Sequence, residues 1–166
     1  MISMILASTN TGGIGNRGTL PWPKHQQDLN WFKQHTQGHV VIMGRKTWDD
    51  PLMPKPLPNR ISYVVTSSTL GPQYTGRVNR ILADPLESLE QIKTSFPSRD
   101  IFVIGGQRLY ETFAPVAERI YLTRMKGNYW CDTRINLERM LACFQIKSVT
   151  PGENCTYEVW DRILYI

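Results

Sequence analysis

The chain has 166 residues, 41% of them hydrophobic, which suits one domain with one sizeable core and excludes a disordered chain. It has no run of eighteen apolar residues, which excludes a membrane span, and its three cysteines form no CxxC motif, which excludes a disulfide framework and gives no support to a metal site. The net charge of +5 favours an anionic ligand or nucleic acid; because the basic residues are scattered, we expect a small anionic ligand.

The predicted elements alternate between strands and helices through the first three quarters of the chain. In chain order we expect a strand at 2–7, a helix at 26–35, a strand at 40–43, a helix at 45–50, strands at 61–65 and 78–82, a helix at 86–96, a strand at 101–104, a helix at 107–113, a strand at 120–125, and late strands at 144–149 and 157–166. The apolar start at 1–7 lacks a basic leader, so we interpret it as a strand and not as a secretory signal.

This alternation predicts an α/β fold in a single domain over residues 1–166. Strands separated by helices form right-handed crossovers in a parallel sheet, whereas two successive strands at the end form an antiparallel hairpin. We therefore expect a mixed, mostly parallel, eight-stranded twisted sheet with about four flanking helices and a C-terminal antiparallel hairpin. The proline-rich piece at 51–58 is predicted to be a stiff loop within the domain.

One carboxylate, Asp28, falls where the first helix shows its apolar face. At helical period it shares a side with Leu29, Phe32 and His35. A carboxylate beside apolar side chains loses hydration and needs hydrogen-bond donors to replace the water. A flat heterocycle with adjacent N–H groups would supply them, although an isolated first-turn Asp is also favoured by the helix dipole alone.

The sequence Gly13-Ile14-Gly15-Asn16-Arg17-Gly18 matches the dinucleotide pattern G-x-G-x-x-G, but it does not open a helix as that pattern requires. Two prolines, Pro21 and Pro23, follow closely and prevent a helix between them. We therefore interpret this segment as a glycine-rich mobile loop between the first strand and the first helix. Loops of this kind often cover a site.

Two other strands run into glycine and then into a helix, at Gly44-Arg45-Lys46-Thr47 and at Gly105-Gly106-Gln107. Cations at a helix start oppose the helix dipole unless an anion binds there, and adjacent glycines let a ligand approach the backbone. Two such turns at the carboxyl ends of parallel strands predict a dinucleotide site.

Separately, Arg60 at the end of the proline-rich loop can bind a carboxylate with both arms of its guanidinium, or be simply solvated.

These motifs, in this order, resemble the dihydrofolate reductase family, and the likeness runs through almost the whole chain. Six segments stand at the family's positions and spacing: Leu20-Pro21-Trp22, Asp28-Leu29-Asn30-Trp31-Phe32-Lys33, Val41-Ile42-Met43-Gly44-Arg45-Lys46-Thr47-Trp48, Leu57-Pro58-Asn59-Arg60, Val103-Ile104-Gly105-Gly106 and Tyr121-Leu122-Thr123. Each segment alone is weak, but six in register are specific.

The resemblance implies a pterin pocket in which Asp28 accepts hydrogen bonds from the 2-amino and ring N–H groups. Thr123 would support that carboxylate through its hydroxyl. Arg60, helped by Lys33, would bind the α-carboxylate of the glutamate tail. The apolar walls would come from Ile5, Leu29, Phe32, Leu57 and Ile104.

The resemblance also implies NADPH as the cofactor, with Arg45, Ser67 and Arg108 holding its 2′-phosphate. The peptide between Gly105 and Gly106 is expected to be cis, and Gln107 stands where many relatives have a third glycine. The residues implied to contact NADPH are Ala7, Ile14, Gly15, Leu20, Gly44, Arg45, Lys46, Thr47, Thr66, Ser67, Ile104, Gly105, Gly106, Gln107, Arg108 and Tyr110.

The implied reaction transfers a hydride from NADPH to C6 of dihydrofolate and adds a proton at N5, which supports one-carbon metabolism and thymidylate synthesis. Asp28, Trp22, Thr123 and Leu20 form the catalytic set, with an ordered water as the proximate proton donor. The lid would span residues 9–24, with Leu20 and Trp22 near the nicotinamide, and Asp132 would hold it through backbone N–H groups. We expect a cytoplasmic monomer with no metal, nucleic acid or membrane partner.

Three alternatives stay open at this point. A reductase of the same fold acting on a pyrimidine intermediate of riboflavin synthesis would have no need of Arg60. A binding module that keeps the ligand without catalysis would have no need of the intact set Asp28, Thr123 and Arg60. Nucleic-acid binding rests on the basic charge alone, and strong salt dependence of duplex DNA binding would favour it.

Overall fold

The computed structural model describes residues 1–82 and 84–163, and its main feature is an eight-stranded sheet in the order β5-β4-β3-β6-β1-β7-β10-β9. The strands are β1 (Ile2–Thr9), β3 (Val40–Gly44), β4 (Ile61–Val65), β5 (Asn79–Ile81), β6 (Ile101–Gly105), β7 (Arg119–Met125), β9 (Phe144–Gly152) and β10 (Cys155–Arg162). Every pair from β5 across to β7 is parallel, whereas β10 is antiparallel to both β7 and β9. The predicted mixed sheet with a C-terminal hairpin is confirmed.

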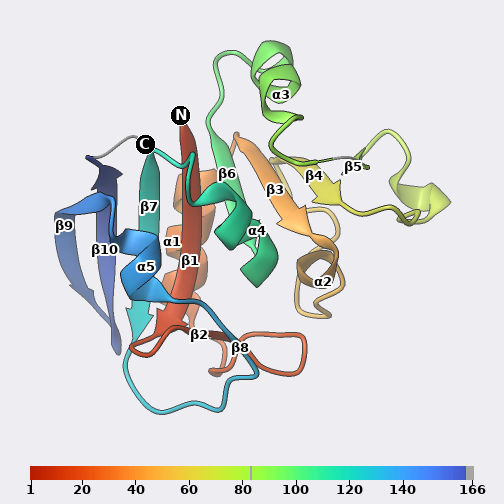
Figure 1. The fold of residues 1–166 in the computed structure, drawn as a ribbon. Helices are drawn as coiled ribbons and strands as arrows, with labels where there is room; N and C mark the ends of the chain where they lie inside the picture. The colour runs from red at the N-terminus through yellow and green to blue at the C-terminus, as the bar shows by residue number, and fades with distance from the viewer. Residues whose placement is uncertain (83, 164–166) are drawn as a thin grey trace.

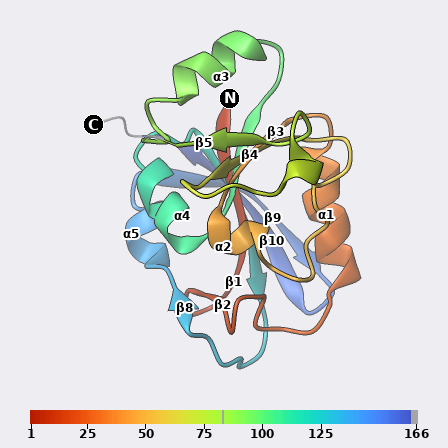
Figure 2. The ribbon, with the colours of Figure 1, turned by 90° about the vertical axis from the view of Figure 1, so that its right-hand side faces the viewer.

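Helices cover both faces of this sheet. They are α1 (Gln26–Thr36), α2 (Arg45–Trp48), α3 (Leu89–Ser95), α4 (Gln107–Phe113) and α5 (Leu137–Leu141), with a 3-10 turn at Pro72–Tyr74. The two views show α1 on one face and α4 and α5 on the other (Figures 1 and 2). The central strand β3 is therefore buried on both sides, which explains its unbroken apolar run.

The core divides into clusters on the two faces because successive side chains of a strand point to opposite sides. Val40 and Ile42 pack in the cluster that contains α4 and α5 residues. Val41 and Met43 pack in the cluster that includes Trp31 and Phe32 of α1. The face that carries α1 is the one on which the candidate site lies.

The helix count differs from the prediction of about four, because α5 is a fifth helix. It has five residues, and its one clear sequence signal is Asn136, whose side chain accepts a hydrogen bond from the Arg139 N–H at 3.0 Å. So short a helix contains too few turns for apolar periodicity to reveal it. The helix predicted at 86–96 begins only at Leu89, since the residues before it form turns.

A second, two-stranded sheet was not predicted. It pairs β2 (Gly13–Gly15), inside the segment interpreted as a loop, with β8 (Thr133–Arg134). Strands of three and two residues carry no alternation that a sequence could show. The last strand ends at Arg162, and residues 164–166 of the predicted strand lie outside the described residues.

No helix within 1–82 and 84–163 has the length and apolar content to cross a bilayer. The same residues contain no group of three or more His, Cys, Asp or Glu side chains able to hold a metal ion.

Candidate active site

The Asp28 carboxylate lies at the start of α1 and faces the sheet. The Thr123 hydroxyl on β7 donates a hydrogen bond to Asp28 Oδ1 at 2.8 Å, and Thr123 itself is buried. The helix begins there because the His25 side chain caps it: Nδ1 accepts the Asp28 N–H at 3.0 Å. The two residues that the sequence placed in one pocket are thus in direct contact.

Burial dominates the electrostatics of this carboxylate. Loss of hydration raises the pKa of Asp28 above its ordinary value, while the Thr123 hydrogen bond and the neighbouring His25 side chain oppose that rise. Within the described part of the chain, Asp28 Oδ2 has no hydrogen-bond partner. One oxygen is therefore held by the protein and the other is available to accept from a ligand N–H group.

Aromatic side chains pack around α1 from its middle to its last turn. Trp31 packs against Tyr157 and His35, with ring centroids 4.5 Å and 4.2 Å apart, and His35 packs against Tyr121 at 4.5 Å. The Trp31 indole N–H is buried and has no partner among the described residues. Trp31 lies one turn along α1 from Asp28 and Tyr157 pairs with Thr123 in the sheet, so aromatic rings near the carboxylate contribute to its loss of hydration.

Arg60 lies in the loop just before β4, beside the last two turns of α1, with its guanidinium over the Phe32 ring at 5.8 Å. Its Nε donates to the Pro58 carbonyl at 2.7 Å and its Nη1 donates to Thr36 Oγ1 at 3.0 Å. Partial burial lowers the pKa of Arg60. These contacts orient the guanidinium while leaving Nη2 without a partner in the described chain, which suits recognition of a carboxylate.

The predicted apolar walls fall into two groups. Ile5 and Leu57 are buried in the cluster on the α1 face, with Phe32 and Ile104 packed against it. Leu29 is 40% exposed, and Lys33 is exposed on the same helix. The structure thus brings Ile5, Phe32, Leu57 and Ile104 into one cluster and places Leu29 and Lys33 at its solvent side.

The two glycine turns of the predicted cofactor site lie against each other. A Cβ built on Gly44 would stand 3.7 Å from the Gly105 carbonyl oxygen and from the Gly106 nitrogen. Thr47 lies over the second turn, 3.3 Å and 3.6 Å from where the Cβ atoms of Gly105 and Gly106 would be. The Gly105–Gly106 peptide is cis, as the resemblance implied.

The helices that follow these turns have no side-chain cap, since Gly44 and Gly106 occupy their N-cap positions. Free backbone N–H groups at two helix starts that follow neighbouring parallel strands fit a pyrophosphate. Tyr110 lies below, where its buried hydroxyl donates to the Ile5 carbonyl at 2.9 Å and burial raises its pKa.

Arg45 is already engaged by the protein. Its Nε donates to both Asp49 carboxylate oxygens at 3.1 Å, and its Nη1 donates to the Thr69 carbonyl at 3.2 Å. The second contact places Arg45 beside the exposed segment that contains Ser67. The other predicted cofactor cations, Lys46 and Arg108, are exposed, and the Thr66 hydroxyl accepts the Ser68 N–H at 3.2 Å.

The predicted lid, residues 9–24, is held from several sides. Asp132 Oδ2 accepts the Arg17 N–H at 2.8 Å, which is the kind of contact that the resemblance implied for Asp132. Thr19 Oγ1 donates to Asp50 Oδ2 at 3.2 Å. Trp22 is buried against Tyr129. The remaining predicted residues of this region, Ala7, Ile14 and Gly15, are half-buried, and Leu20 is 42% exposed.

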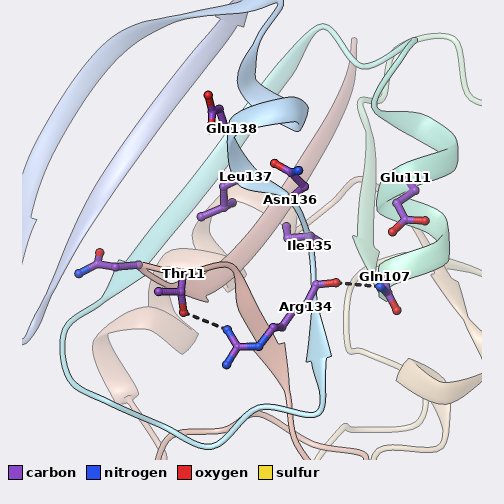
Figure 3. A pocket seen from close by; sticks show the side chains of 9 residues that line it. Thr11, Gln107, Glu111, Arg134, Ile135, Asn136, Leu137 and Glu138 are labelled. Carbon is purple, nitrogen blue, oxygen red and sulfur yellow. Dashed lines mark hydrogen bonds between the residues drawn. The ribbon is translucent and has the colours of Figure 1, made fainter.

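A polar hollow of about 550 Å³ lies between the β1–β2 turn, the start of α4 and the segment leading into α5 (Figure 3). Gln107 Nε2 donates to the Arg134 carbonyl at 2.8 Å, and Arg134 Nη1 donates to Thr11 Oγ1 at 2.9 Å. Asp28 and Arg60 do not line this hollow, so it is not the predicted substrate site. Its lining residues are Asn10, Thr11, Gln107, Glu111, Arg134, Ile135, Asn136, Leu137 and Glu138.

Sequence reasoning missed two side chains next to Asp28. His25 and Gln27 both reach the turn between β9 and β10, where they contact Glu153. His25 stands just before the helix, but histidine is not a favoured N-cap residue, so its role was not visible in the pattern.

The family model described as dihydrofolate reductase matches residues 1–157. The chain is 35% identical over 167 residues to dihydrofolate reductase type 9 of Escherichia coli, covering 96% of this chain and 92% of that protein. It is 40% identical over 132 residues to the dihydrofolate reductase of Bacillus subtilis, covering 80% and 73%. It is 35% identical over 156 residues to a bifunctional dihydrofolate reductase-thymidylate synthase of Paramecium tetraurelia, covering 92% of this chain and 32% of that protein.

These matches define the class first: the chain is an oxidoreductase with a mixed α/β sheet. It belongs to the dihydrofolate reductase family. The family and the enzyme class predicted from the sequence are both confirmed.

Proposed function

We propose that this protein catalyses the NADPH-dependent reduction of 7,8-dihydrofolate to 5,6,7,8-tetrahydrofolate, as a monomer in the cytoplasm. The observation that carries the proposal is the half-buried Asp28 carboxylate, held by Thr123 at 2.8 Å with one oxygen left for a ligand. Membership of the dihydrofolate reductase family supports the reaction class. Both features point to a flat heterocycle with adjacent N–H donors.

Asp28 is assigned to binding and polarisation of the pterin ring. Its free oxygen accepts a hydrogen bond from the ring edge, and its raised pKa keeps a proton near the ring to higher pH than an ordinary Asp would. Thr123 fixes the orientation of the carboxylate. A water completes the proton delivery to N5.

Arg60 is assigned to the α-carboxylate of the glutamate tail, while Ile5, Phe32, Leu57 and Ile104 form the apolar wall. Leu29 and Lys33, at the solvent side, are assigned to the benzoyl and glutamate portions. Because this wall excludes water, the ionic contacts beside it are strengthened.

The residues around the two glycine turns fit NADPH, because two uncapped helix starts and nearby cations suit a pyrophosphate and a further phosphate. When bound, the nicotinamide supplies the hydride that C6 accepts. The pyrophosphate region would be held by Gly44, Lys46, Thr47, Gly105, Gly106 and Gln107. The 2′-phosphate side would be held by Arg45, Thr66, Ser67 and Arg108. The nicotinamide side would be lined by Ala7, Ile14, Gly15, Leu20, Trp22, Ile104 and Tyr110.

The test is the fall of NADPH absorbance when dihydrofolate is added to the purified protein. We expect turnover with NADPH and a kcat/KM at least about tenfold lower with NADH, since NADH lacks the phosphate proposed for Arg45. No oxidation of either cofactor in the presence of dihydrofolate would overturn the proposal.

A same-fold reductase for a substrate without a glutamate tail is the second candidate, and Arg60 separates the two. Arg60→Ala should raise the KM for dihydrofolate by about tenfold or more while leaving the KM for a pterin without that tail unchanged. Equal effects on both substrates would remove Arg60 from tail recognition.

A further inference from the structure

The first turn of α1 is joined to the turn between β9 and β10 by two side chains that the proposed chemistry does not use. His25 Nε2 lies 2.5 Å from the Glu153 carbonyl oxygen, and Gln27 Oε1 accepts the Glu153 N–H at 2.7 Å. Both backbone polar groups of one residue are therefore satisfied by the start of the helix. The contacts span 128 and 126 residues, so they are tertiary links and not local capping.

The His25 ring connects these two places by using both of its nitrogens. Nδ1 accepts the Asp28 N–H at 3.0 Å, and a backbone N–H can only donate. Nδ1 must therefore carry a lone pair, which in a neutral imidazole leaves the proton on Nε2, where it points to the Glu153 carbonyl. One ring thus caps the backbone of Asp28 and ties it to the hairpin.

Gln27 extends the link toward the residue that holds the carboxylate. Its Oε1 also accepts the Tyr157 hydroxyl at 3.3 Å, and Tyr157 pairs directly with Thr123 in the β10–β7 register. Thr123 in turn donates to Asp28 Oδ1. The carboxylate is held by Thr123 on β7, and its backbone is tied through His25 to the turn between β9 and β10.

We propose that His25 and Gln27 are positioning residues, which with Glu153 form a clamp that fixes Asp28 for the pterin edge. This inference rests on the proposed function of Asp28. It makes the β9–β10 turn a determinant of substrate affinity although that turn contacts no substrate. The clamp fixes the position of the carboxylate and does not contact the reacting atoms. Its loss should therefore weaken substrate binding more than it slows the chemical step.

The sharpest test is Gln27→Met, which keeps the size of the side chain and removes the acceptor oxygen. Gln26→Met is the matched control, because the side chain of the neighbouring Gln26 bonds, among the described residues, only to Asn30 within the same helix. We expect Gln27→Met to raise the KM for dihydrofolate about fivefold, with kcat and the KM for NADPH within about twofold. Gln26→Met should leave all three unchanged.

A second variant separates the cap from the clamp. His25→Asn keeps a side-chain oxygen able to cap the helix but cannot reach Glu153, whereas His25→Ala loses both contacts. We expect His25→Asn to raise the KM for dihydrofolate about as much as Gln27→Met does, and His25→Ala to raise it further. If either Gln27→Met or His25→Asn lowers the melting temperature while leaving that KM unchanged, the role is purely structural and the proposal is overturned.

Amide hydrogen exchange gives a readout that needs no substrate. The N–H groups of Glu153 and Leu29 should exchange faster in Gln27→Met than in Gln26→Met, since the clamp protects the turn and the first helical turn alike. Unchanged exchange would overturn the clamp even in an active enzyme. Absence of dihydrofolate turnover in the unmodified protein would instead overturn the proposed function, so the two failures are distinguishable.

Discussion

At the scale of single residues, Asp28 is subject to opposing influences. Loss of hydration raises its pKa, while the Thr123 hydroxyl and the neighbouring His25 side chain favour its ionised form. Loss of hydration is the largest of these, so the protonated form persists to higher pH than in an ordinary Asp. A carboxyl group that stays protonated to higher pH than usual is suited to help protonate a bound ring.

A first prediction concerns the pH profile. The rate of hydride transfer should fall as pH rises through the raised pKa of Asp28, by up to about tenfold per pH unit above it, because the proton is then lost from the site. Asp28→Asn should reduce turnover at least about a hundredfold and abolish this dependence, with NADPH binding nearly intact. Single-turnover rates across the pH range would measure both, and a variant with unchanged turnover would remove Asp28 from the mechanism.

A second prediction at this scale is that Asp28 costs stability. A carboxyl whose folded pKa is raised favours the folded state only while it is protonated, and that contribution is lost as pH rises through the folded pKa. Asp28→Asn should therefore raise the melting temperature at neutral pH, by roughly 1 to 4 °C, and should not do so at acid pH. Thermal unfolding at both pH values checks this, and a lower melting temperature at neutral pH would contradict it.

At the scale of elements, the two adjacent glycines after β6 have different requirements. Gly105 has a φ of +125°, and a Cβ there would stand 3.2 Å from the Tyr110 hydroxyl. Gly106 has a φ of −98°, and a Cβ there would meet only Thr47 Oγ1, at an ordinary 3.6 Å. The first glycine is needed by the fold, while the second leaves space above the start of α4.

A third prediction uses this contrast. Gly105→Ala should destabilise the fold by about 1–3 kcal/mol, because alanine is strained at that φ and crowds a buried hydroxyl. Gly106→Ala should keep the melting temperature and raise the dissociation constant for NADPH about tenfold, since its methyl group fills the phosphate turn. Calorimetry and cofactor titration of the pair measure this, and unchanged NADPH affinity in Gly106→Ala would remove the turn from the cofactor site.

The lid is the second element that supports a prediction, because Asp132 holds the Arg17 N–H across the β2–β8 sheet. The Arg17 N–H and the Thr133 hydroxyl lower the pKa of Asp132, so the contact persists until pH falls well into the acid range. Asp132→Ala should change turnover or the KM for NADPH about fivefold through a looser lid. Asp84→Ala, which removes an equivalent loop hydrogen bond to Leu86, should change neither. Equal behaviour of the two variants would contradict a role for Asp132.

At the scale of the whole molecule, the sheet could be predicted because each of its main strands is marked by a short stretch of the sequence. Val40–Gly44 is a continuous apolar strand because helices cover both faces, and the prediction needed only that run and the glycine that ends it. Asp28 could be placed because Phe32 one turn along shares its face. Local pattern placed only residues whose surroundings are set by neighbours within one or two turns, whereas the contact of Asp28 with Thr123, 95 residues away, was expected only from the family resemblance.

What could not be predicted depends on contacts between distant segments. Gly12 packs so closely on Ile135 that a Cβ would lie 2.1 Å from its carbonyl oxygen, and this contact brings β2 beside β8. The approach joins segments more than a hundred residues apart, as does the His25 contact with Glu153. Neither pairing leaves a periodic signal, because each depends on a few atoms meeting after the sheet has formed.

The final prediction concerns how the C-terminal hairpin is attached to the parallel sheet. Arg119 and Asp161 stand directly opposite in the β7–β10 register, with Nε to Oδ1 at 2.6 Å and Nη2 to Oδ2 at 3.3 Å. The Arg119 contact lowers the pKa of Asp161, with a smaller contribution from Lys147. A carboxyl whose folded pKa is lowered stabilises the fold above its unfolded pKa, and that contribution disappears as pH falls through the folded pKa.

Asp161→Asn should therefore reduce the free energy of unfolding at neutral pH by about 0.5–1 kcal/mol, a modest value because the pair is partly exposed. The difference from the unmodified protein should shrink to zero in acid, where both chains lack the charge. Glu90→Gln, which breaks the more exposed pair with Lys93, should change nothing measurable at either pH. Denaturant unfolding along a pH series measures all three proteins. A difference that persists undiminished in acid would mean that side-chain packing, and not the charge on Asp161, joins the hairpin to β7.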